Sequence, residues 1–232
     1  MKNLKDYRNK ELTIFIVANI LLFHVIHQFI KVDANELFNA TEVFSQIFTS
    51  VIMSVIAFGF ILVTECLLTS GTKEKLLYLF GFFGLLNLPG CMIFTNIKNK
   101  NIDSRFSYQN LIIKYPTLYE NLPESKEERL RYENEKWYAI YSQNRDVPMI
   151  YNSQRDWLLF RDIYITTLVI ICLYIVLIKM SFVEFSCPYL LFLITMAIIT
   201  NFGTNRKAAR FAYNVIAYDV HTAPEKEKKG DL

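Results

Sequence analysis

Charged side chains are scarce in this sequence, and they are nearly absent from five long stretches. Asp, Glu, Lys and Arg make up 20% of the residues, whereas hydrophobic residues make up 53% and aromatic residues 15%. Soluble domains are about a quarter charged. The low charge and its segregation argue against an ordinary soluble domain and predict an all-α, polytopic integral membrane protein.

The short motifs of common enzyme and nucleotide-binding families are also absent. The sequence contains no P-loop, GxGxxG, HExxH or GxSxG motif and no protein-kinase signature. These absences favour a protein that is not an enzyme but leave a membrane enzyme open, because membrane enzymes often lack short motifs, and we assign no catalytic residue. The net charge of +3 is small, and no basic run alternates with aromatic residues, so nucleic acid is not an expected partner.

No CxxC pair occurs, and all four cysteines lie in apolar stretches. A thiol in apolar surroundings behaves as a small hydrophobic group. We therefore expect no disulfide from Cys66, Cys91, Cys172 or Cys187. No metal site and no cofactor are expected.

Four stretches are apolar enough to cross a bilayer, for which a helix needs about 20 mostly apolar residues. They are residues 12–32, 47–68, 163–180 and 185–202, and none has a polar face at the helical period. The basic N-terminus is followed by no cleavage site typical of signal peptides. We therefore interpret the first stretch as a retained anchor.

A fifth apolar stretch, residues 76–97, is broken by glycine and proline. It contains Gly81, Gly84, Asn87, Pro89 and Gly90. Pro89 removes a backbone donor and disfavours helix at the preceding residue. The stretch is either a kinked fifth span or a re-entrant hairpin, and its broken backbone either lines an ion path or only shapes helix packing.

Basic residues favour four spans, because Lys and Arg collect on the cytoplasmic or matrix side of a membrane. With a re-entrant third stretch, that side holds all 25 basic residues except Lys31 and Lys179. Five spans would place the basic N-terminus and the basic middle segment on opposite sides. We predict both termini on the inner side of a bacterial cytoplasmic or mitochondrial inner membrane.

This topology divides the chain into four parts. An N-terminal membrane region, residues 1–97, is followed by a small, polar, helical soluble insertion, residues 98–162. A membrane hairpin, residues 163–202, and an amphipathic helix with a polar tail, residues 203–232, complete the chain.

The soluble insertion is predicted to contain a helix that starts near residue 125. Ser125 and Glu128 have the spacing of a capping box, in which each side chain accepts a hydrogen bond from a free backbone N–H of the first turn. Leu130, Trp137 and Tyr141 then fall on one face. Three Arg-Asp steps follow, at 145–146, 155–156 and 161–162; they either order the segment through ion pairs or lie by coincidence on a solvated surface.

The segment after the last span is predicted to be a basic amphipathic helix. Its apolar face includes Phe211, and Lys207 and Arg210 fall on another face. Such a helix either lies in the membrane interface beside anionic lipid or docks on the soluble insertion or another subunit. The residues predicted at an interface or partner contact are Leu130, Trp137, Tyr141, Trp157, Arg206, Lys207, Arg210 and Phe211.

Three ionisable residues lie inside the predicted spans. His24 and His27 are three residues apart in the first span, and Glu65 lies near the end of the second. Ionisable residues at membrane depth are candidates for function. The histidines either share a metal or a proton or are neutral, hydrogen-bonded residues near the interface; Glu65 either binds a cation or an arginine or reaches the headgroups.

These patterns favour a non-catalytic membrane subunit that anchors or assembles a larger complex, such as a respiratory accessory subunit or a component of a secretion or defence system. A homo-oligomeric ion channel or pore-forming effector is the alternative, and a small transporter or membrane enzyme is the weaker one. The expected partners are the lipid bilayer and either other proteins or further copies of this chain.

Overall fold

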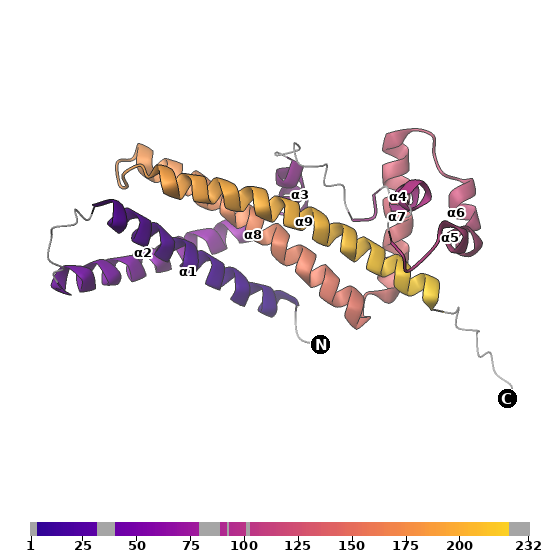
Figure 1. Cartoon of the computed structure of the whole chain (residues 1–232), viewed down its shortest axis with the longest axis horizontal. Helices are drawn as coiled ribbons and strands as arrows, with labels where there is room; N and C mark the ends of the chain where they lie inside the picture. The colour runs from indigo at the N-terminus through magenta and orange to yellow at the C-terminus, as the bar shows by residue number, and fades with distance from the viewer. Residues whose placement is uncertain (1–3, 32–39, 79–88, 92, 101–102, 223–232) are drawn as a thin grey trace, which may run out of the picture. The chain divides into compact units, whose positions relative to one another are not determined.

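The computed structural model describes residues 4–31, 40–78, 89–91, 93–100 and 103–222. The regular elements in these residues are α-helices, and no strand occurs among them, so the prediction of an all-α fold is confirmed. The helices are α1 (Leu4–Lys31), α2 (Ala40–Leu67), α3 (Ser70–Tyr78), α4 (Ile93–Lys100), α5 (Tyr108–Lys114), α6 (Pro116–Glu120), α7 (Lys126–Asn144), α8 (Pro148–Lys179) and α9 (Cys187–His221) (Figure 1).

The chain forms two compact units. Unit 1 contains Met1–Phe83 and Leu158–Thr204, and unit 2 contains Gly84–Trp157 and Asn205–Leu232. Helix α4, which overlaps the end of the predicted fifth apolar stretch, belongs to unit 2. Each of the two longest helices, α8 and α9, contributes one part to each unit.

Unit 1 is built from long helices around an apolar core. Its buried residues are Leu12, Ile16, Ile61, Ile170, Tyr174, Tyr189 and Leu193. The ring of Phe23 lies 5.9 Å from that of Tyr174 and 4.9 Å from that of Tyr189, so the second half of α1 meets the end of α8 and the start of α9. Within this unit, α1 therefore runs parallel to α8 and antiparallel to α2 and α9 (Figure 1).

Two helices of the described chain, α8 with 32 residues and α9 with 35, are long and apolar enough to cross a membrane. This is fewer than the four spans that the sequence predicts. Helices α1 and α2 have 28 residues each, and their side chains are described only in part. Both α8 and α9 extend well beyond the apolar stretches 163–180 and 185–202, because no proline or positive-φ residue stops either helix where the polar sequence begins.

The exposed side chains of unit 1 are largely apolar. On α2 they recur on successive turns, from Phe44, which is 73% exposed, through Val55 at 66% to Leu67 at 76%. Similar exposed residues occur along α1, α8 and α9. A large exposed apolar surface indicates contact with lipid, with a ligand or with another protein.

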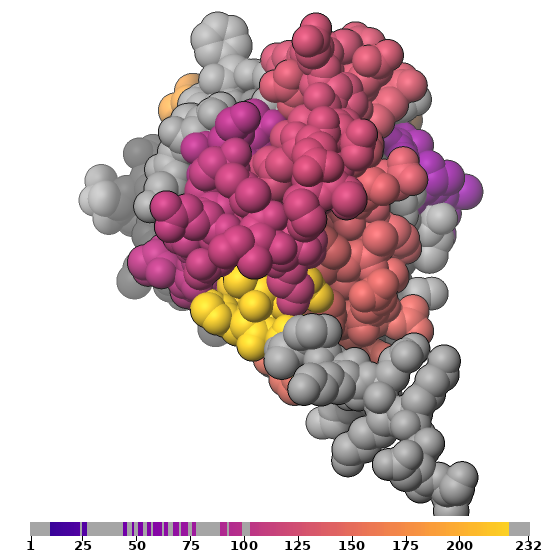
Figure 2. Space-filling view, turned by 90° about the vertical axis from the view of Figure 1, so that its right-hand side faces the viewer, coloured from indigo at the N-terminus to yellow at the C-terminus, as the bar shows by residue number. Residues whose placement is uncertain are grey.

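Unit 2 buries its apolar side chains in a core of its own. The core residues are Ile93, Phe94, Ile97, Phe106, Leu111, Leu118, Trp137, Phe211, Val215 and Ile216. Figure 2 shows this unit with the end of α9, in yellow, against the magenta and pink segments of α4 to α7.

Local sequence explains where the short helices of unit 2 begin. The side chain of Ser107 accepts the backbone N–H of Asn110 at the start of α5, and Pro116 occupies the first turn of α6, where its missing N–H is not needed. The predicted helix at residue 125 is present as α7, but its capping box is wrong, because the Ser125 side chain makes no cap hydrogen bond. Instead, Arg129 Nε donates to the carbonyl oxygen of Pro123 at 2.7 Å and holds the approach to the helix.

Candidate functional site

Three charged side chains form a buried ion cluster in unit 1: Lys73 on α3 and Arg161 and Asp162 on α8. Asp162 is completely buried, with its Oδ1 3.6 Å from Lys73 Nζ and 3.1 Å from Arg161 Nη2. Lys73 is 5% exposed and Arg161 6%. Removing charges from water is so unfavourable that buried charges persist only when they are paired and hydrogen-bonded. This cluster therefore fixes α3 against α8.

Two polar side chains beside the ion cluster contact the end of α3. Tyr164 Oη on α8 lies 3.5 Å from the carbonyl oxygen of Leu76, and Asn201 Nδ2 on α9 lies 3.4 Å from that of Leu77. Carbonyl groups in the last turn of a helix have no partner within the helix. The contacts place α3 where the apolar part of α8 begins and the apolar part of α9 ends.

The sequence pointed to only part of this cluster. Its third Arg-Asp step, Arg161–Asp162, is the buried pair. The first step, Arg145–Asp146, is an exposed pair at 4.0 Å, and in the second Arg155 and Asp156 are 3.1 Å apart and half-buried. Lys73 was not among the residues predicted at a site, because no local pattern indicates that a lysine so distant in sequence pairs with Asp162.

The ionisable candidates of the first two spans lie on helices whose side chains are partly outside the described residues. His24 and His27 belong to α1 and Glu65 belongs to α2, but nothing is described of their side chains. Among the side chains that the structure describes, no three from His, Cys, Asp and Glu gather as metal ligands.

The broken apolar stretch is described only at its start, in α3, and at its end. Gly81, Gly84 and Asn87 lie outside the described residues, whereas Pro89 and Gly90 form a turn before α4. A Cβ atom added to Gly90 would lie 2.8 Å from Trp137 Cβ and 2.9 Å from Asn134 Oδ1. Only glycine allows the backbone to approach α7 so closely.

The interface candidates of unit 2 form an aromatic cluster within the chain: Trp137, Tyr141, Trp157 and Phe211. The ring of Phe211 packs at 5.2 Å from Trp137, 5.4 Å from Tyr141 and 5.8 Å from Trp157. Trp137 stacks on Tyr141 at 5.5 Å, and its Nε1 donates to the carbonyl oxygen of Ala212 at 3.2 Å. Leu130 lies half-buried on α7. The end of α9 is therefore docked on α7, one of the two arrangements left open by the sequence.

Polar contacts at the end of α9 strengthen this docking. Asp219 accepts a hydrogen bond from Tyr115 Oη and lies 3.3 Å from Lys114 Nζ. Burial, and then the hydrogen bond to Asp219, raise the pKa of Tyr115. Arg105 Nη1 donates to Asn214 Oδ1 at 2.6 Å, while its Nη2 pairs with Asp103 at the same distance and lowers the pKa of that carboxyl group.

The buried carboxylate Glu133 joins α7 to the first turn of α4. It is completely buried, accepts the N–H of Phe94 at 2.9 Å and that of Thr95 at 3.3 Å, and also accepts the Thr95 hydroxyl. A carboxylate at a helix N-terminus satisfies free N–H groups and complements the helix dipole. Burial raises the pKa of Glu133, and the hydrogen bonds from Thr95 and Phe94 oppose that shift.

The three basic candidates on α9 have different surroundings. Lys207 Nζ pairs with Asp156 Oδ2 on α8 at 2.8 Å. Arg206 and Arg210 are exposed.

The chain matches no family model, no curated protein sequence and no solved structure. Its function is therefore inferred from its own residues and their geometry.

Proposed function

We propose that this chain is an integral membrane protein whose four apolar helical segments cross the bilayer. These segments belong to α1, α2, α8 and α9, and the N- and C-termini lie on the cytoplasmic or matrix side. The exposed apolar surface of unit 1 carries this proposal. In water, each exposed apolar side chain would lack roughly 25 cal/mol of stabilisation for every Å² left unburied. In hydrocarbon, the same side chain is removed from water and this loss does not arise.

The contacts of α3 support four spans rather than five. Lys73 pairs with Asp162, and Leu76 and Leu77 contact Tyr164 and Asn201. Helix α3 thus lies at the same end of unit 1 as the start of the apolar part of α8. The segment that connects them leaves and returns at one end, which fits a third apolar stretch that does not cross the membrane.

Within the membrane, we propose that the protein is a non-catalytic subunit that anchors or assembles a larger complex. Unit 2 has its own core and a mostly polar exposed surface, of which the exposed face of α7, with Glu127, Glu128 and Arg131, is an example. A folded polar module carried by a membrane bundle suits the recruitment of partner proteins. A homo-oligomeric channel is a weaker proposal, because the described end of the broken stretch packs against Trp137.

Matched arginine substitutions test the membrane proposal. Val55 on α2 is 66% exposed and Ile113 on α5 is 80% exposed. An arginine at the centre of a spanning helix opposes insertion by about 3 kcal/mol, so Val55→Arg should leave much of the protein outside the membrane fraction. Ile113→Arg should leave membrane integration unchanged. Equal membrane integration of both variants after alkaline extraction would contradict the proposal.

Purification of the native complex tests the assembly role. Cells producing the tagged chain are extracted in a mild detergent, and the mass of the particle and its protein content are measured. We expect a stoichiometric partner protein. A particle that contains this chain alone would remove the assembly role while leaving the membrane proposal intact.

A further inference from the structure

Several side-chain oxygens inside unit 1 are buried without a hydrogen-bond partner among the residues that the structure describes. They include Asn19 Oδ1 on α1, Thr166 Oγ1 on α8 and Ser186 Oγ at the start of α9. Asn19 is 3% exposed and Ser186 4%, and Thr166 is completely buried. A buried polar group without a hydrogen bond is unfavourable. Each of these oxygens is therefore suited to bind a donor such as water.

Two of these side chains point into the same interior. At 100° per residue, Asn19 lies within about 60° of Ile16 around α1, and Thr166 lies within about 40° of Ile170 around α8. Ile16 and Ile170 belong to the apolar core of unit 1. Asn19 and Thr166 therefore face one another's helices rather than the outer surface of the unit.

Polar groups recur along this interior about once per helical turn. At 1.5 Å per residue, Thr166 lies about 6 Å beyond Asp162 along the axis of α8, and Tyr174 lies about 18 Å beyond it. Phe23 of the parallel helix α1 lies beside Tyr174. Asn19, four residues before Phe23, therefore lies about 12 Å beyond the level of Asp162. Successive groups are about 6 Å apart along the bundle.

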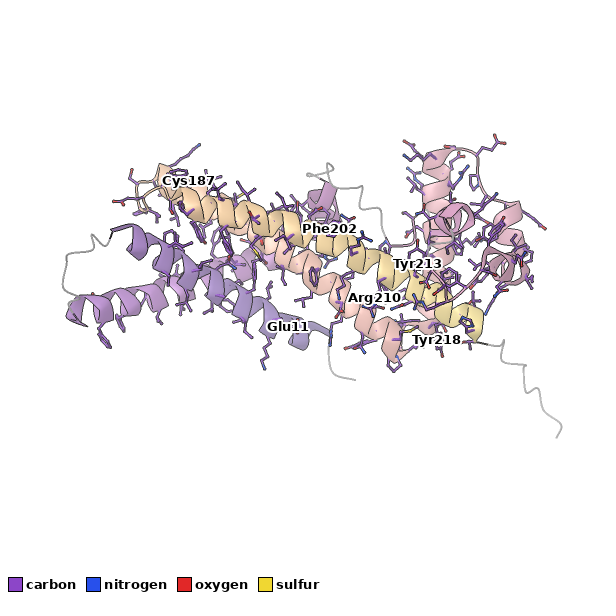
Figure 3. The ribbon with its side chains drawn as sticks, viewed as in Figure 1. Glu11, Cys187, Phe202, Arg210, Tyr213 and Tyr218 are labelled. Atoms are coloured by element: carbon purple, nitrogen blue, oxygen red, sulfur yellow. The ribbon has the colours of Figure 1, made fainter. Side chains whose placement is uncertain are left out.

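The row of polar groups reaches both ends of the apolar part of unit 1. The Tyr174 hydroxyl accepts the N–H of Ser186 at 2.6 Å, beside the turn between α8 and α9. At the other end, Asp162 lies in the ion cluster, and Glu11, near the start of the parallel helix α1, has a buried carboxylate oxygen. Figure 3 labels Glu11 and, at the opposite end, Cys187, which follows Ser186. We call Asp162, Thr166, Asn19, Tyr174 and Ser186 the polar row.

The spacing of the polar row fits single water molecules. Two hydrogen bonds of about 2.8 Å in series span about 5.6 Å, so one water can bridge oxygens that are one turn apart. Hydroxyl groups and water both donate and accept hydrogen bonds, which allows a proton to pass along them. Ile16 and Leu193 are completely buried in the same core, and this close packing excludes a hydrated ion. The chemistry therefore favours protons over metal cations.

We infer that the polar row conducts protons through unit 1, between Asp162 on the side of the termini and Ser186 at the opposite turn. At each step an oxygen accepts a proton from one neighbour and releases a proton to the next, so no group is oxidised or reduced. Asn19 holds a water through its amide oxygen and is not itself protonated. The inference rests on the proposed membrane topology and agrees with the occurrence of buried polar residues in proton relays of membrane proteins.

Proton uptake by proteoliposomes tests this inference. The full-length chain is reconstituted with a pH-sensitive dye inside, and a potassium gradient with valinomycin drives protons inward. Wild-type protein should admit protons faster than protein-free liposomes. Thr166→Val and Asn19→Leu each remove one hydrogen bond to a transferring water at nearly constant volume, which should slow uptake about ten-fold.

Two further variants separate conduction from folding. Thr166→Ser keeps a hydroxyl group and should conduct like the wild type. Thr195→Val is the matched control, because Thr195 is exposed on α9 and its hydroxyl donates to its own helix at Leu191. It should leave proton uptake unchanged.

Two outcomes would overturn the proton path. One is wild-type uptake no faster than that of protein-free liposomes. The other is unchanged uptake in Thr166→Val and Asn19→Leu together with higher melting temperatures, which would show that the two oxygens are merely unpaired and hold no water. Failure of the membrane topology is distinguishable, because the chain would then be released from the liposomes by alkaline extraction. A chain that resists extraction but conducts no protons loses only the proton path.

Discussion

Asp162 and Glu133 are both completely buried carboxylates, but their charges are compensated differently. Asp162 lies between two cations, Lys73 and Arg161, and its role is to join helices through charge. Glu133 accepts hydrogen bonds from the first turn of α4, and desolvation is the largest influence on its pKa. A buried carboxyl group such as Glu133, whose pKa is shifted by desolvation, makes the free energy of unfolding depend on pH.

The first prediction concerns this pH dependence. The pKa of Glu133 is raised above its ordinary value of 4.5, so the folded chain holds the proton more tightly than the unfolded chain. Its contribution to stability is therefore complete below about pH 4.5 and falls as the pH rises through the folded-state pKa. As the pH rises over that range, the free energy of unfolding of the wild-type protein should fall relative to that of Glu133→Gln.

Tryptophan fluorescence during urea unfolding measures this effect, because both tryptophans, Trp137 and Trp157, belong to unit 2. Glu128→Gln, an exposed position on the same helix, should follow the wild type at every pH. A wild-type protein that gained stability relative to Glu133→Gln as the pH rose would show the opposite sign of the pKa shift.

One residue in each unit sets how closely two helices meet: a glycine in unit 1 and a buried tryptophan in unit 2. In unit 1, a Cβ atom on Gly203 of α9 would lie 2.5 Å from Cδ1 and Cε1 of Phe160 on α8. In unit 2, Trp137 of α7 is 3% exposed and touches α9 through its ring and its N–H group.

Gly203→Ala should destabilise unit 1 by about 1–3 kcal/mol, because the added methyl group overpacks the contact with Phe160. Gly59→Ala is the control, since a Cβ there meets no atom within 4 Å, and alanine favours helix by about 1 kcal/mol over glycine. Thermal unfolding in detergent compares the variants. Adding Phe160→Ala to Gly203→Ala should remove most of the overpacking; additive losses in the double variant would refute this explanation.

Trp137→Ala should destabilise unit 2 by about 3–5 kcal/mol, the usual loss for a buried tryptophan. It should also speed amide hydrogen exchange in residues 208–217 of α9, where Phe211 and Ala212 contact this side chain. Tyr138→Ala, at the next position and 59% exposed, should change neither measurement by much. Equal exchange rates in the two variants would mean that α9 is held by other contacts.

At the scale of the whole chain, the topology depends on where the connection between α3 and α8 runs. The ion cluster and the contacts of Leu76 and Leu77 bring both ends of this connection to one end of unit 1. This arrangement agrees with the proposed topology of four crossings, in which the third apolar stretch does not cross the membrane.

Single cysteines at three exposed positions test this topology after the native cysteines are replaced. Thr69 precedes α3, Glu128 lies on α7, and Ser181 follows α8. A membrane-impermeant thiol reagent should label Thr69→Cys and Glu128→Cys from the same side and Ser181→Cys from the other. Labelling of Thr69→Cys and Glu128→Cys from opposite sides would favour a fifth span.

Sequence alone determined the helical class and located the apolar parts of α8 and α9, because hydrophobicity and helical periodicity are properties of neighbouring residues. It also identified the helix after Ser125, but the aromatic cluster that several interface candidates form within the chain was not predicted. Local rules failed at the cap of that helix, where Arg129 rather than a capping box holds the approach.

Only the tertiary structure decided which distant residues meet. Lys73 reaches Asp162, Glu133 accepts the first N–H groups of α4, and Trp137 donates to Ala212 across 75 positions of sequence. The tertiary structure also decided that the amphipathic end of α9 docks on α7, where the sequence had left a lipid surface open as the alternative. Each contact depends on how helices pack, and packing depends on shape and burial summed over the whole unit rather than on any local pattern.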